Sequence, residues 1–577
     1  MSIFKKKRGQ KLSTRLSRFS RKASLVSERH IKENFFSRLS HVGDVRLFVL
    51  EWGLLVFALL MLALTQVFWY SESFSTSAYT SGGTYTEATL GKINSLNPLF
   101  ASTETEKTLS RLLFSSLTAP DSSGATGNAL AESVISDASG KTWTVRLREN
   151  LKWSDGEPLT NEDIIFTVNL IKNSAVASGY SSNLSGVSVS EDNNKNLIFS
   201  LKSSYADFAS ALGFPILPKH ILESVEPGRL LESNFSTNPV GSGPFSFNAT
   251  QNIGTDGEAV VYLTNNENYY KGRPNVNSFV VHAYVSTNDI KTALKSGTIT
   301  ATAELLPTDS EEVSSKTIYE KQTTINSGAY LFLNTRSAVL SNKDLRKAIQ
   351  KGINVDELRS LVGDEPELKY PILKKQIELA EWPALPEHNL DEAKEMVKNA
   401  DGVGKSLNLA TVSTGYFPVL VEDLKAQLEE LGFKVNVTVY EPGQDFIVNI
   451  IAPRSYDLLL YEVELGAEPD ILAYYHSSQA TQSGLNLSNY NNALVDDLIL
   501  ATRETVDPEL QNAKYLSFLK HWIEDVPSIG LYQVNMSYYF DKTVKTFSED
   551  NTLVSPVDRF SDIKYWSVEK TTKNRTP

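Results

Sequence analysis

Side chains that commonly do chemistry form no recognisable site in this sequence of 577 residues. Cysteine is absent, which excludes disulfides, thiolate metal sites, a cysteine nucleophile and a lipid-bearing cysteine anchor. Histidine is present, but no two histidines have the HxH or HxxxH spacing that is typical of zinc sites. The histidines are at positions 30, 41, 220, 282, 388, 476 and 521. We therefore expect no metal site.

Motifs for nucleophilic catalysis and nucleotide binding are also missing. The chain has neither a GxSxG elbow nor a GxGxxG fingerprint that opens a helix. Gly402-Val-Gly-Lys405 lacks the upstream glycine spacing of a phosphate-binding loop. A pair of catalytic carboxylates cannot be picked out of 68 Asp and Glu residues by sequence alone. The sequence predicts a binding protein with no catalytic residues and no cofactor, and a cleft enzyme stays open as an alternative.

The charge is distributed unevenly along the chain. Residues 1–46 contain 13 Lys and Arg and three acids, a net charge of +10. Glu51 is the only charged residue in 47–70, and the chain as a whole has a net charge of −12, so residues 71–577 carry −21. A basic tail before an acidic body indicates either a nucleic-acid arm or a membrane topology signal.

The apolar run between the tail and the body favours a membrane topology signal over a nucleic-acid arm. WGLLVFALLMLALTQVFW, residues 52–69, has no formal charge in 18 residues, and as a helix it is about 27 Å long, close to the hydrocarbon thickness of a bilayer. Trp52, Trp69 and Tyr70 are placed like an interfacial aromatic belt. We predict a basic cytoplasmic tail, 1–46, a transmembrane helix, 47–70, a Ser/Thr-rich stalk, 71–82, and an extracellular or periplasmic body. A cleaved signal peptide is the alternative; the long basic segment before the run and the poor small-residue site near Ala78 favour an uncleaved anchor. With the tail explained as a topology signal, we expect no nucleic acid partner.

The body alternates between strand-like and helix-like segments, which predicts a large α/β protein of more than one lobe. LKWSDGEPLTNEDIIFTVNLIK, residues 151–172, contains an Asp-Gly turn, Thr160 as helix N-cap with Asp163 three residues on, and Leu159 with Ile164 as a hydrophobic staple. Residues 407–412, 418–430 and 434–440, with Gly432 after the helix, predict a βαβ unit. Further helices are expected over 343–352 and 391–399, and strands over 141–148, 196–201, 260–263 and 278–285.

Gly241-Ser-Gly-Pro244 has two interpretations. Two glycines before a proline allow the backbone to approach another segment closely at a junction between lobes, and they also suit a tight surface turn. The sequence does not decide between them.

Five segments, taken in order, resemble the family 5 extracellular solute-binding proteins, the peptide-binding subunits of ABC importers. The WSDGEPLTNED segment resembles the W-x-DG-x-P-[LV]-T-x-x-D signature of that family. The other four are NPVGSGPF (238–245), YLFLN with DLRKAI and INVDE (330–357), NYN with VD (489–496) and DVPSIGLY (525–532). The resemblance covers about 83–570.

The resemblance implies a periplasmic-binding-protein-like α/β fold of the hinged type II, with three lobes. Lobe I would consist of 83–108, 237–325 and 537–570, lobe II would be an insertion, 109–236, and lobe III would be 326–536. Ligand would be enclosed between lobes I and III by hinge closure. The family binds extended peptides largely through backbone hydrogen bonds, so its sequence preference can be loose.

The resemblance also implies ligand-binding positions. These are Ala101, Ser102, Thr103, Glu104, Tyr180, Phe446, Glu462, Val463, Glu464, Leu465 and Gly466. Tyr180 and Phe446 equally suit ordinary packing. The lobe III loop departs from the family, because the Gly-Trp-x-x-Asp whose aspartate binds the α-ammonium of the peptide is absent. Glu462 or Glu464 could supply that negative charge, and both also suit a solvated loop.

By resemblance, the chain is a membrane-anchored monomer that captures peptides and delivers them to ABC permease subunits. The bilayer, contacted through 47–70, is its other partner. Alternatives from other classes are a ligand-sensing or adhesion ectodomain on the same fold, and a binder of a metal chelate or a sugar, since other family members bind nickel chelates and sugars.

Overall fold

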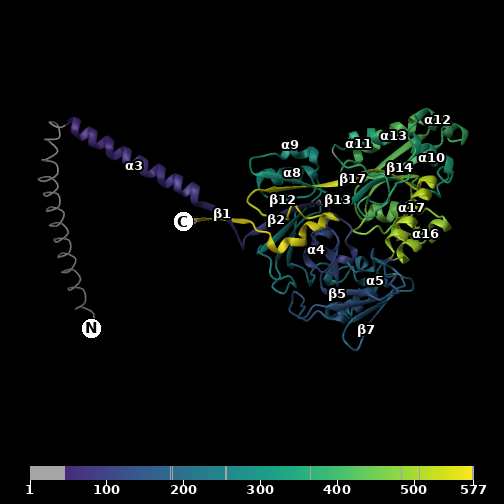
Figure 1. The fold of residues 1–577 in the computed structure, drawn as a ribbon, viewed down its shortest axis with the longest axis horizontal. Helices are drawn as coiled ribbons and strands as arrows, with labels where there is room; N and C mark the ends of the chain where they lie inside the picture. Colours follow the sequence, from purple (N-terminus) through teal and green to yellow (C-terminus); the bar gives the residue numbers. More distant parts are fainter. Residues whose placement is uncertain are drawn as a thin grey trace, which may run out of the picture. The chain divides into compact units, whose positions relative to one another are not determined.

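The computed structural model describes residues 46–181, 183–184, 186–253, 257–363, 365–482, 484–505 and 507–574. The chain divides into two compact units: Met1–Ala78 with Thr571–Pro577, and Tyr79–Lys570, here called the body. Residues 1–45 of the predicted cytoplasmic tail lie outside the described residues. Figure 1 shows the arrangement within each unit.

The predicted membrane segment is a single helix, α3, Arg46–Phe74. Within it, Leu50–Val67 has a mean hydropathy of 1.9 and none of its residues is buried, so the apolar surface is free on all sides. Such a helix is long and apolar enough to cross a bilayer, and a signal sequence near the N-terminus has the same properties. In the segment predicted as a stalk, 71–82, residues 71–74 continue the helix and Ser75–Thr80 form strand β1, and its role as a stalk stays a prediction. Its threonines suit an extended strand.

The body is built around one mixed sheet of ten strands, in the order β15-β14-β16-β13-β17-β12-β2-β11-β10-β9. Neighbouring strands run parallel in some pairs, such as β2 with β11 and β14 with β15, and antiparallel in others, such as β13 with β17. The ten strands are β2 Thr84–Leu90, β9 Phe245–Ile253, β10 Glu258–Asn265, β11 Ser278–Tyr284, β12 Ala301–Thr302, β13 Ile318–Leu333, β14 Ser406–Val412, β15 Lys434–Tyr440, β16 Leu458–Glu464 and β17 Ser528–Asp541.

The two longest strands join the two halves of this sheet. Strand β13 has 16 residues and β17 has 14, and they pair antiparallel from Ile318↔Asp541 to Phe332↔Ser528. Their register shifts between Thr324 and Gly328 and again at Ala329/Tyr330. An irregularity of this kind bends a strand locally. The boundaries predicted between lobes I and III, 325/326 and 536/537, fall inside these strands beside the first shift, and they stay predictions.

The predicted insertion, 109–236, contains a separate antiparallel sheet, β5-β6-β8-β7, and helix α5, Asn161–Lys172. The predicted helix start at Thr160 is confirmed: the Thr160 backbone nitrogen donates to Asp163 Oδ2 at 2.8 Å. Leu159 and Ile164, the predicted staple, are both buried. The predicted boundary at 108/109 falls inside a continuous helix, α4, Glu104–Leu113. The strands are β5 Ala131–Ser136, β6 Thr142–Leu147, β7 Ser188–Glu191 and β8 Leu197–Ser200, with a further hairpin, β3 Thr118–Pro120 and β4 Thr126–Asn128.

The Gly241–Pro244 segment is a close backbone approach and not a surface turn. A Cβ on Gly241 would lie 1.8 Å from the carbonyl oxygen of Leu113, the last residue of α4. The Gly243 nitrogen donates to that same carbonyl at 2.8 Å, and the Ser154 nitrogen donates to the Gly241 carbonyl at 2.8 Å. The WSDGEP and NPVGSGP segments therefore meet each other, and both act as scaffold under α4.

The predicted βαβ unit is confirmed in the remaining half of the body. Strands β14 and β15 pair parallel, α13, Phe417–Glu430, connects them, and Gly432 after the helix has φ +102°. Helix α10, Lys343–Gly352, has the predicted bounds, and α12, Leu390–Asn399, begins one residue early. Among the described residues, the other helices of four or more residues are α6 Phe208–Ala211, α7 Lys219–Leu222, α8 Thr287–Ser296, α9 Ser310–Val313, α11 Val355–Ser360, the π-helix η7 Ile447–Ile451, α15 Leu472–Tyr475, α16 Ala493–Glu504, α17 Pro508–Asp525 and the 3-10 helix η9 Pro556–Tyr565.

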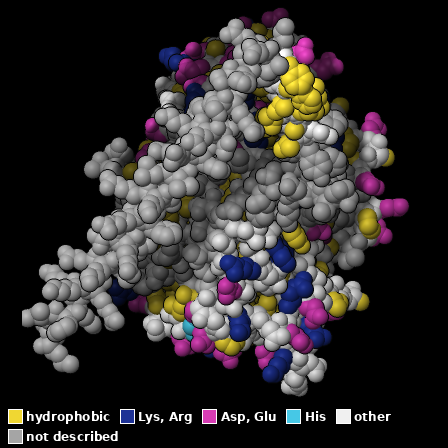
Figure 2. All heavy atoms as spheres, turned by 90° about the vertical axis from the view of Figure 1, so that its left-hand side faces the viewer, with side chains coloured by type: hydrophobic (Ala, Val, Ile, Leu, Met, Phe, Trp, Pro, Cys, Tyr) yellow, Lys and Arg dark blue, Asp and Glu magenta, His cyan; other side chains and the backbone are white. Residues whose placement is uncertain are grey.

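Charged side chains cover the described surface of the body. Figure 2 shows Asp and Glu side chains spread over the face that it presents, with several Lys and Arg side chains gathered on the lower half. This mixture agrees with the excess of acids that the sequence places in residues 71–577. A net negative charge favours solubility and does not by itself identify a binding site.

Candidate functional site

The predicted ligand-binding segments meet where helix α4 faces the end of strand β16. The Lys107 ammonium lies 2.9 Å from Glu464 Oε1 and 3.0 Å from Glu104 Oε1. The side chains of Lys107 and Glu464 are 38% and 48% exposed. Burial by itself would raise the pKa of the Glu464 carboxyl. The charge of Lys107 has the larger effect and lowers that pKa. Water therefore reaches the pair, while the surrounding protein desolvates the Glu464 carboxyl. Because the pair joins the predicted lobes I and III, we call this place the interlobe gap.

Local sequence explains how α4 presents Lys107. Thr103 is the N-cap: its Oγ1 accepts from the Glu106 nitrogen at 3.2 Å, and Glu106 Oε2 accepts in return from the Thr103 nitrogen at 3.2 Å. The Ser102 nitrogen and hydroxyl also donate to Glu106 Oε2. Ser102 and Thr103 therefore fix the start of the helix. Ala101 precedes them and is half-buried, whereas Glu104 contributes its carboxylate to Lys107.

The predicted ligand-binding positions 462–466 do not all lie on the same face of strand β16, because side chains alternate between its two faces. Strand β16 pairs antiparallel with β13, with Glu462 opposite Ala329 and Glu464 opposite Ser327. Val463 and Leu465 are each 8% exposed and pack in the core of the βαβ half, since alternate side chains point to opposite faces of a strand. Gly466 follows with φ +70°, and its carbonyl accepts from Asn326 Nδ2 at 2.7 Å. The carboxylates of Glu462 and Glu464 are the side chains that this strand gives to the gap.

Tyr180, from the predicted insertion, also lies near this ion pair. Burial, with the Glu464 carboxylate adding to its effect and Lys107 opposing it, raises the pKa of the Tyr180 hydroxyl to about 12. Tyr474 was not predicted, and its hydroxyl donates to the Glu464 carbonyl oxygen. Burial, followed by Glu464, raises the pKa of Tyr474 as well. Two tyrosines from different parts of the chain thus flank Glu464.

Phe446 is placed differently from the other predicted positions. It is 3% exposed, and its ring centroid is 5.5 Å from that of Tyr440 and 5.8 Å from that of Tyr461. Burial raises the pKa of Tyr461 and Lys107 lowers it, so Tyr461 lies within electrostatic reach of Lys107 although its ring packs against the core. The Phe446 ring thus packs against the ring of Tyr461. Whether it contacts ligand stays a prediction.

Raised carboxyl pKa values occur at Glu462 and at two residues that the sequence does not single out, Glu304 and Glu365. Burial raises the pKa of Glu462 to about 7, and the nearby Glu104 adds to the rise. Burial and Glu104 raise the pKa of Glu304 to about 8. Burial and Glu462 raise the pKa of Glu365 to about 7, although the Asn535 nitrogen donates to Glu365 Oε2 at 2.6 Å. Glu304 and Glu365 come from loops with no motif, so only proximity in the fold identifies them.

A second group of contacts joins the insertion to the βαβ half. Asp470 Oδ2 accepts from the Tyr205 hydroxyl at 2.7 Å and from Arg503 NH2 at 3.1 Å. The Arg503 guanidinium lies 3.7 Å from the centroid of the Tyr205 ring, and the Ala206 nitrogen donates to the Arg503 carbonyl at 2.9 Å. These contacts connect segments some 265 residues apart, so in this structure the parts on either side of the gap are in contact.

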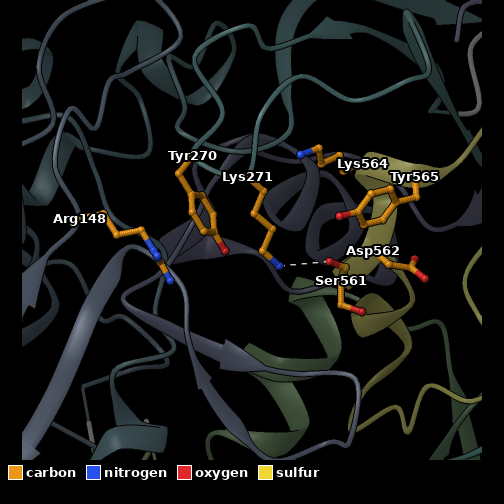
Figure 3. Close-up of a pocket in the computed structure, with 7 residues that line it drawn as sticks. All are labelled: Arg148, Tyr270, Lys271, Ser561, Asp562, Lys564 and Tyr565. Carbon is orange, nitrogen blue, oxygen red and sulfur yellow. Dashed lines mark hydrogen bonds between the residues drawn. The ribbon is translucent and has the colours of Figure 1, made fainter.

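Another cavity lies away from the gap. Figure 3 shows this pocket of about 440 Å³, in which the Lys271 ammonium donates to the Ser561 carbonyl at 3.2 Å. The lining residues are Arg148, Tyr270, Lys271, Ser561, Asp562, Lys564 and Tyr565. None of the predicted ligand-binding residues is among them. Because its polar lining is mainly basic, this pocket differs in chemistry from the acidic gap.

Comparisons with known proteins identify the family of the chain. The family model described as bacterial extracellular solute-binding proteins, family 5 Middle, matches residues 126–482. The oligopeptide-binding protein AppA of Bacillus subtilis (strain 168) is 26% identical over 486 residues, which cover 79% of this chain and 87% of AppA.

Solved structures show the same fold. The structure of AppA from Bacillus subtilis in complex with a nonapeptide has a TM-score of 0.75 at 23% identity, over 85% of this chain and 100% of that chain. NikZ from Campylobacter jejuni in complex with Ni(L-His) has a TM-score of 0.74 at 21% identity, over 84% of this chain and 99% of that chain. The body therefore has the mixed α/β fold of periplasmic binding proteins. With the family model matched over most of the body, the chain belongs to the bacterial extracellular solute-binding proteins of family 5.

Proposed function

We propose that this chain is a membrane-anchored solute-binding protein of an ABC importer, which captures extracellular peptides in the interlobe gap and delivers them to a permease. The observation that carries the proposal is the ion pair of Lys107 with Glu464, in which a partly exposed carboxylate already holds an ammonium group from a distant segment. The N-terminus of a peptide is also an ammonium group. A charged hydrogen bond of this kind contributes about 1.5–3 kcal/mol.

Hinge closure supplies the capture step. The gap lies between segments that β13 and β17 connect, and both strands have an irregular register beside Gly328. Two connecting strands with a local bend suit a hinge that swings one half of the sheet relative to the other. Ligand bound in the closed form would be sequestered from water, and no covalent bond would change. Energy for transport would come from a separate ATPase subunit.

Helix α3 supports membrane attachment. Its apolar window Leu50–Val67 follows the basic segment 1–46, and the positive-inside rule assigns that segment to the cytoplasm. Tethering would raise the concentration of the binding protein near the permease. Sequencing the N-terminus of protein from the membrane fraction tests this part. We expect a start at or near Met1, and a start near Tyr79 would show that the helix is a cleaved signal.

Calorimetry with the full chain in a non-ionic detergent tests peptide capture. We expect tripeptides with a free amino terminus to bind about tenfold or more tightly than the same peptides after N-acetylation, because acetylation removes the ammonium. Glu464→Gln should remove most of that difference, whereas Glu149→Gln, on an exposed side chain of the insertion, should not. Equal affinity of the free and acetylated peptides would remove the ammonium role of Glu464.

A non-peptide solute is a second candidate, and one observation favours keeping it. NikZ, with the same fold, is solved with Ni(L-His). Native mass spectrometry of the protein purified from its source separates the two candidates, because a ligand held in a closed gap is retained on purification. A retained peptide supports the first proposal and a metal chelate supports the second.

A further inference from the structure

The pocket of Figure 3, here called the basic pocket, shares no residue with the predicted ligand-binding positions. Its volume of about 440 Å³ is within the range of about 300–1,000 Å³ that small-molecule sites occupy. Three separate segments line it: Arg148 follows β6, Tyr270 and Lys271 follow β10, and 561–565 belong to η9. The fold brings these segments together, so no motif in the sequence marks the pocket.

Three cations converge on the basic pocket. The Arg148 guanidinium and the Lys271 ammonium lie 5.8 and 5.7 Å from the centroid of the same Tyr270 ring. The Lys564 ammonium lies 3.2 Å from the position that a Cβ on Gly272 would take, next to Lys271 in the chain. The three positive charges therefore surround one small volume.

These cations have no acidic partner close by. Within the part of the chain that the structure describes, none of the three lies within ion-pair distance of a carboxylate. Lys271 donates to the Ser561 carbonyl at 3.2 Å, and Arg148 Nε donates to the Ala129 carbonyl at 2.6 Å, but both acceptors are uncharged. The sequence of the body is strongly acidic, so unpaired cations gathered in one pocket indicate a site for an anion.

Asp562 is the acid of the lining, and its oxygens already have partners. Its Oδ1 accepts from Trp566 Nε1 at 2.7 Å, and its Oδ2 accepts from two further donors. Figure 3 shows its carboxylate directed away from the Lys271 ammonium. Burial, Arg111 and Arg148 lower the pKa of Lys271, and the more distant Asp562 opposes them. An anion in the pocket would supply the charge that this lysine lacks.

We propose that the basic pocket is a second binding site, which takes a phosphate group. Arg148, Lys271 and Lys564 against Asp562 give the lining a net charge of +2, which suits a doubly charged phosphate ester. Guanidinium and ammonium groups are the side-chain groups that bind phosphate in proteins. This site goes beyond the proposed capture of peptides and does not depend on it.

A soluble ester and a phospholipid headgroup can both supply the phosphate. The basic pocket lies beside the first residues of the body, because the Gly82 nitrogen donates to the Asn275 carbonyl at 2.7 Å and the Asn275 nitrogen donates to the Lys564 carbonyl at 3.0 Å. In a chain anchored through 47–70, this is the end of the body that the chain connects to the anchor. The headgroup as source rests on the proposed membrane attachment, and the soluble ester does not.

Calorimetry with glycerol 3-phosphate tests the site in the full chain in non-ionic detergent. We expect glycerol 3-phosphate to bind and glycerol not to bind. Lys271→Gln should weaken the binding about tenfold or more, as expected for the loss of one charged hydrogen bond. Lys141→Gln, on an exposed lysine of the insertion, is the matched control and should bind as the parent does. Equal Tm values of the two variants show that both are folded.

Lysine acetylation, read by mass spectrometry, locates the ligand and identifies its source. Glycerol 3-phosphate should protect Lys271 and Lys564 from an amine-acetylating reagent and leave Lys141 reactive. The same reaction in lipid nanodiscs, without added ester, compares phosphatidylglycerol with phosphatidylcholine. Protection in phosphatidylglycerol alone assigns the lipid headgroup, and protection by glycerol 3-phosphate alone assigns the soluble ester.

Two results would overturn the phosphate site. One is that neither the ester nor the anionic lipid protects Lys271 and Lys564. The other is that Lys271→Gln binds glycerol 3-phosphate as tightly as the parent chain. Either result leaves peptide capture standing, because the free and acetylated peptides test that function at Glu464. The N-terminal sequence of the membrane-fraction protein decides the anchor independently of both.

Discussion

Lys107 and Glu464 are 357 residues apart in the sequence, and their side chains form an ion pair of 2.9 Å across the interlobe gap. Helix α4 carries the lysine and the last residue of strand β16 is the glutamate. The carboxylates of Glu104 and Glu464 raise the pKa of Lys107 well above its usual value, so it stays charged throughout the physiological range. The contact ties helix α4 to strand β16.

Removing this pair should shift the protein toward an open form. Exposed pairs of this kind contribute at most about 1 kcal/mol, so we expect Lys107→Met to raise the open population by up to about fivefold. The chain has no cysteine, so spin labels can be attached at Asn194→Cys in the insertion and Lys398→Cys in α12 without background. Electron–electron distance measurements on the doubly labelled chain should show a longer and broader distribution. Lys141→Met, an exposed lysine of the insertion, is the control, and an identical distribution in both variants would contradict the role of Lys107.

Arg559 should be essential for the stability of the body. Its guanidinium, 2% exposed, pairs with Glu87 at 2.5 Å, and Glu87 is fully buried on β2. The Tyr538 hydroxyl donates to the other oxygen of Glu87 at 2.7 Å. Arg559→Met leaves this carboxylate buried without its cation, which should cost about 3–5 kcal/mol in the free energy of unfolding. Chemical denaturation measures the loss.

The double variant Glu87→Gln/Arg559→Met is the control for this interpretation. It removes both charges, so it should recover much of the stability that Arg559→Met loses. If the double variant is as unstable as the single one, packing around the arginine and not charge compensation is what matters.

Glu304 should make the stability of the ligand-free body depend on pH. Burial, with Glu104 adding to it, raises the pKa of Glu304 from 4.5 to about 8 in the folded protein. The folded state therefore holds a proton that the unfolded state releases between about pH 4.5 and pH 8, so stability falls as the pH rises through this window. The Glu304→Gln variant has no carboxyl at this position, so it should not lose stability in this way as the pH rises. We expect the variant to have a higher Tm than the parent at pH 8.5 and a similar Tm at pH 4.5, by differential scanning fluorimetry. An equal difference at both pH values would show that Glu304 does not titrate in this range.

Gly241 should accept no side chain. A Cβ there would lie 1.8 Å from the Leu113 carbonyl oxygen, and both groups belong to backbone that other hydrogen bonds hold in place. We expect Gly241→Ala to cost about 3 kcal/mol or more in the free energy of unfolding, because backbone cannot move aside as a flexible side chain can. Gly179→Ala is the control, since a Cβ at Gly179 would meet nothing within 4 Å. Comparable stability of the two variants would mean that the junction has room to relax.

Local structure and family could both be predicted from the sequence. The start of α5 at Thr160, the βαβ unit around Gly432 and the apolar run of α3 follow from interactions within a few residues, such as caps, turns and periodicity. Glu462 and Glu464 could be proposed as site residues because their loop lacks the Gly-Trp-x-x-Asp of the family and they could supply the missing negative charge. That Lys107 reaches Glu464, and that Glu104 acts on the carboxyls of Glu304 and Glu462, follows from the fold and not from the sequence. These groups come from separate segments, and no pattern in the sequence encodes their distance. Their pKa values and their partners depend on how the chain folds to bring β16, α4 and the loops together.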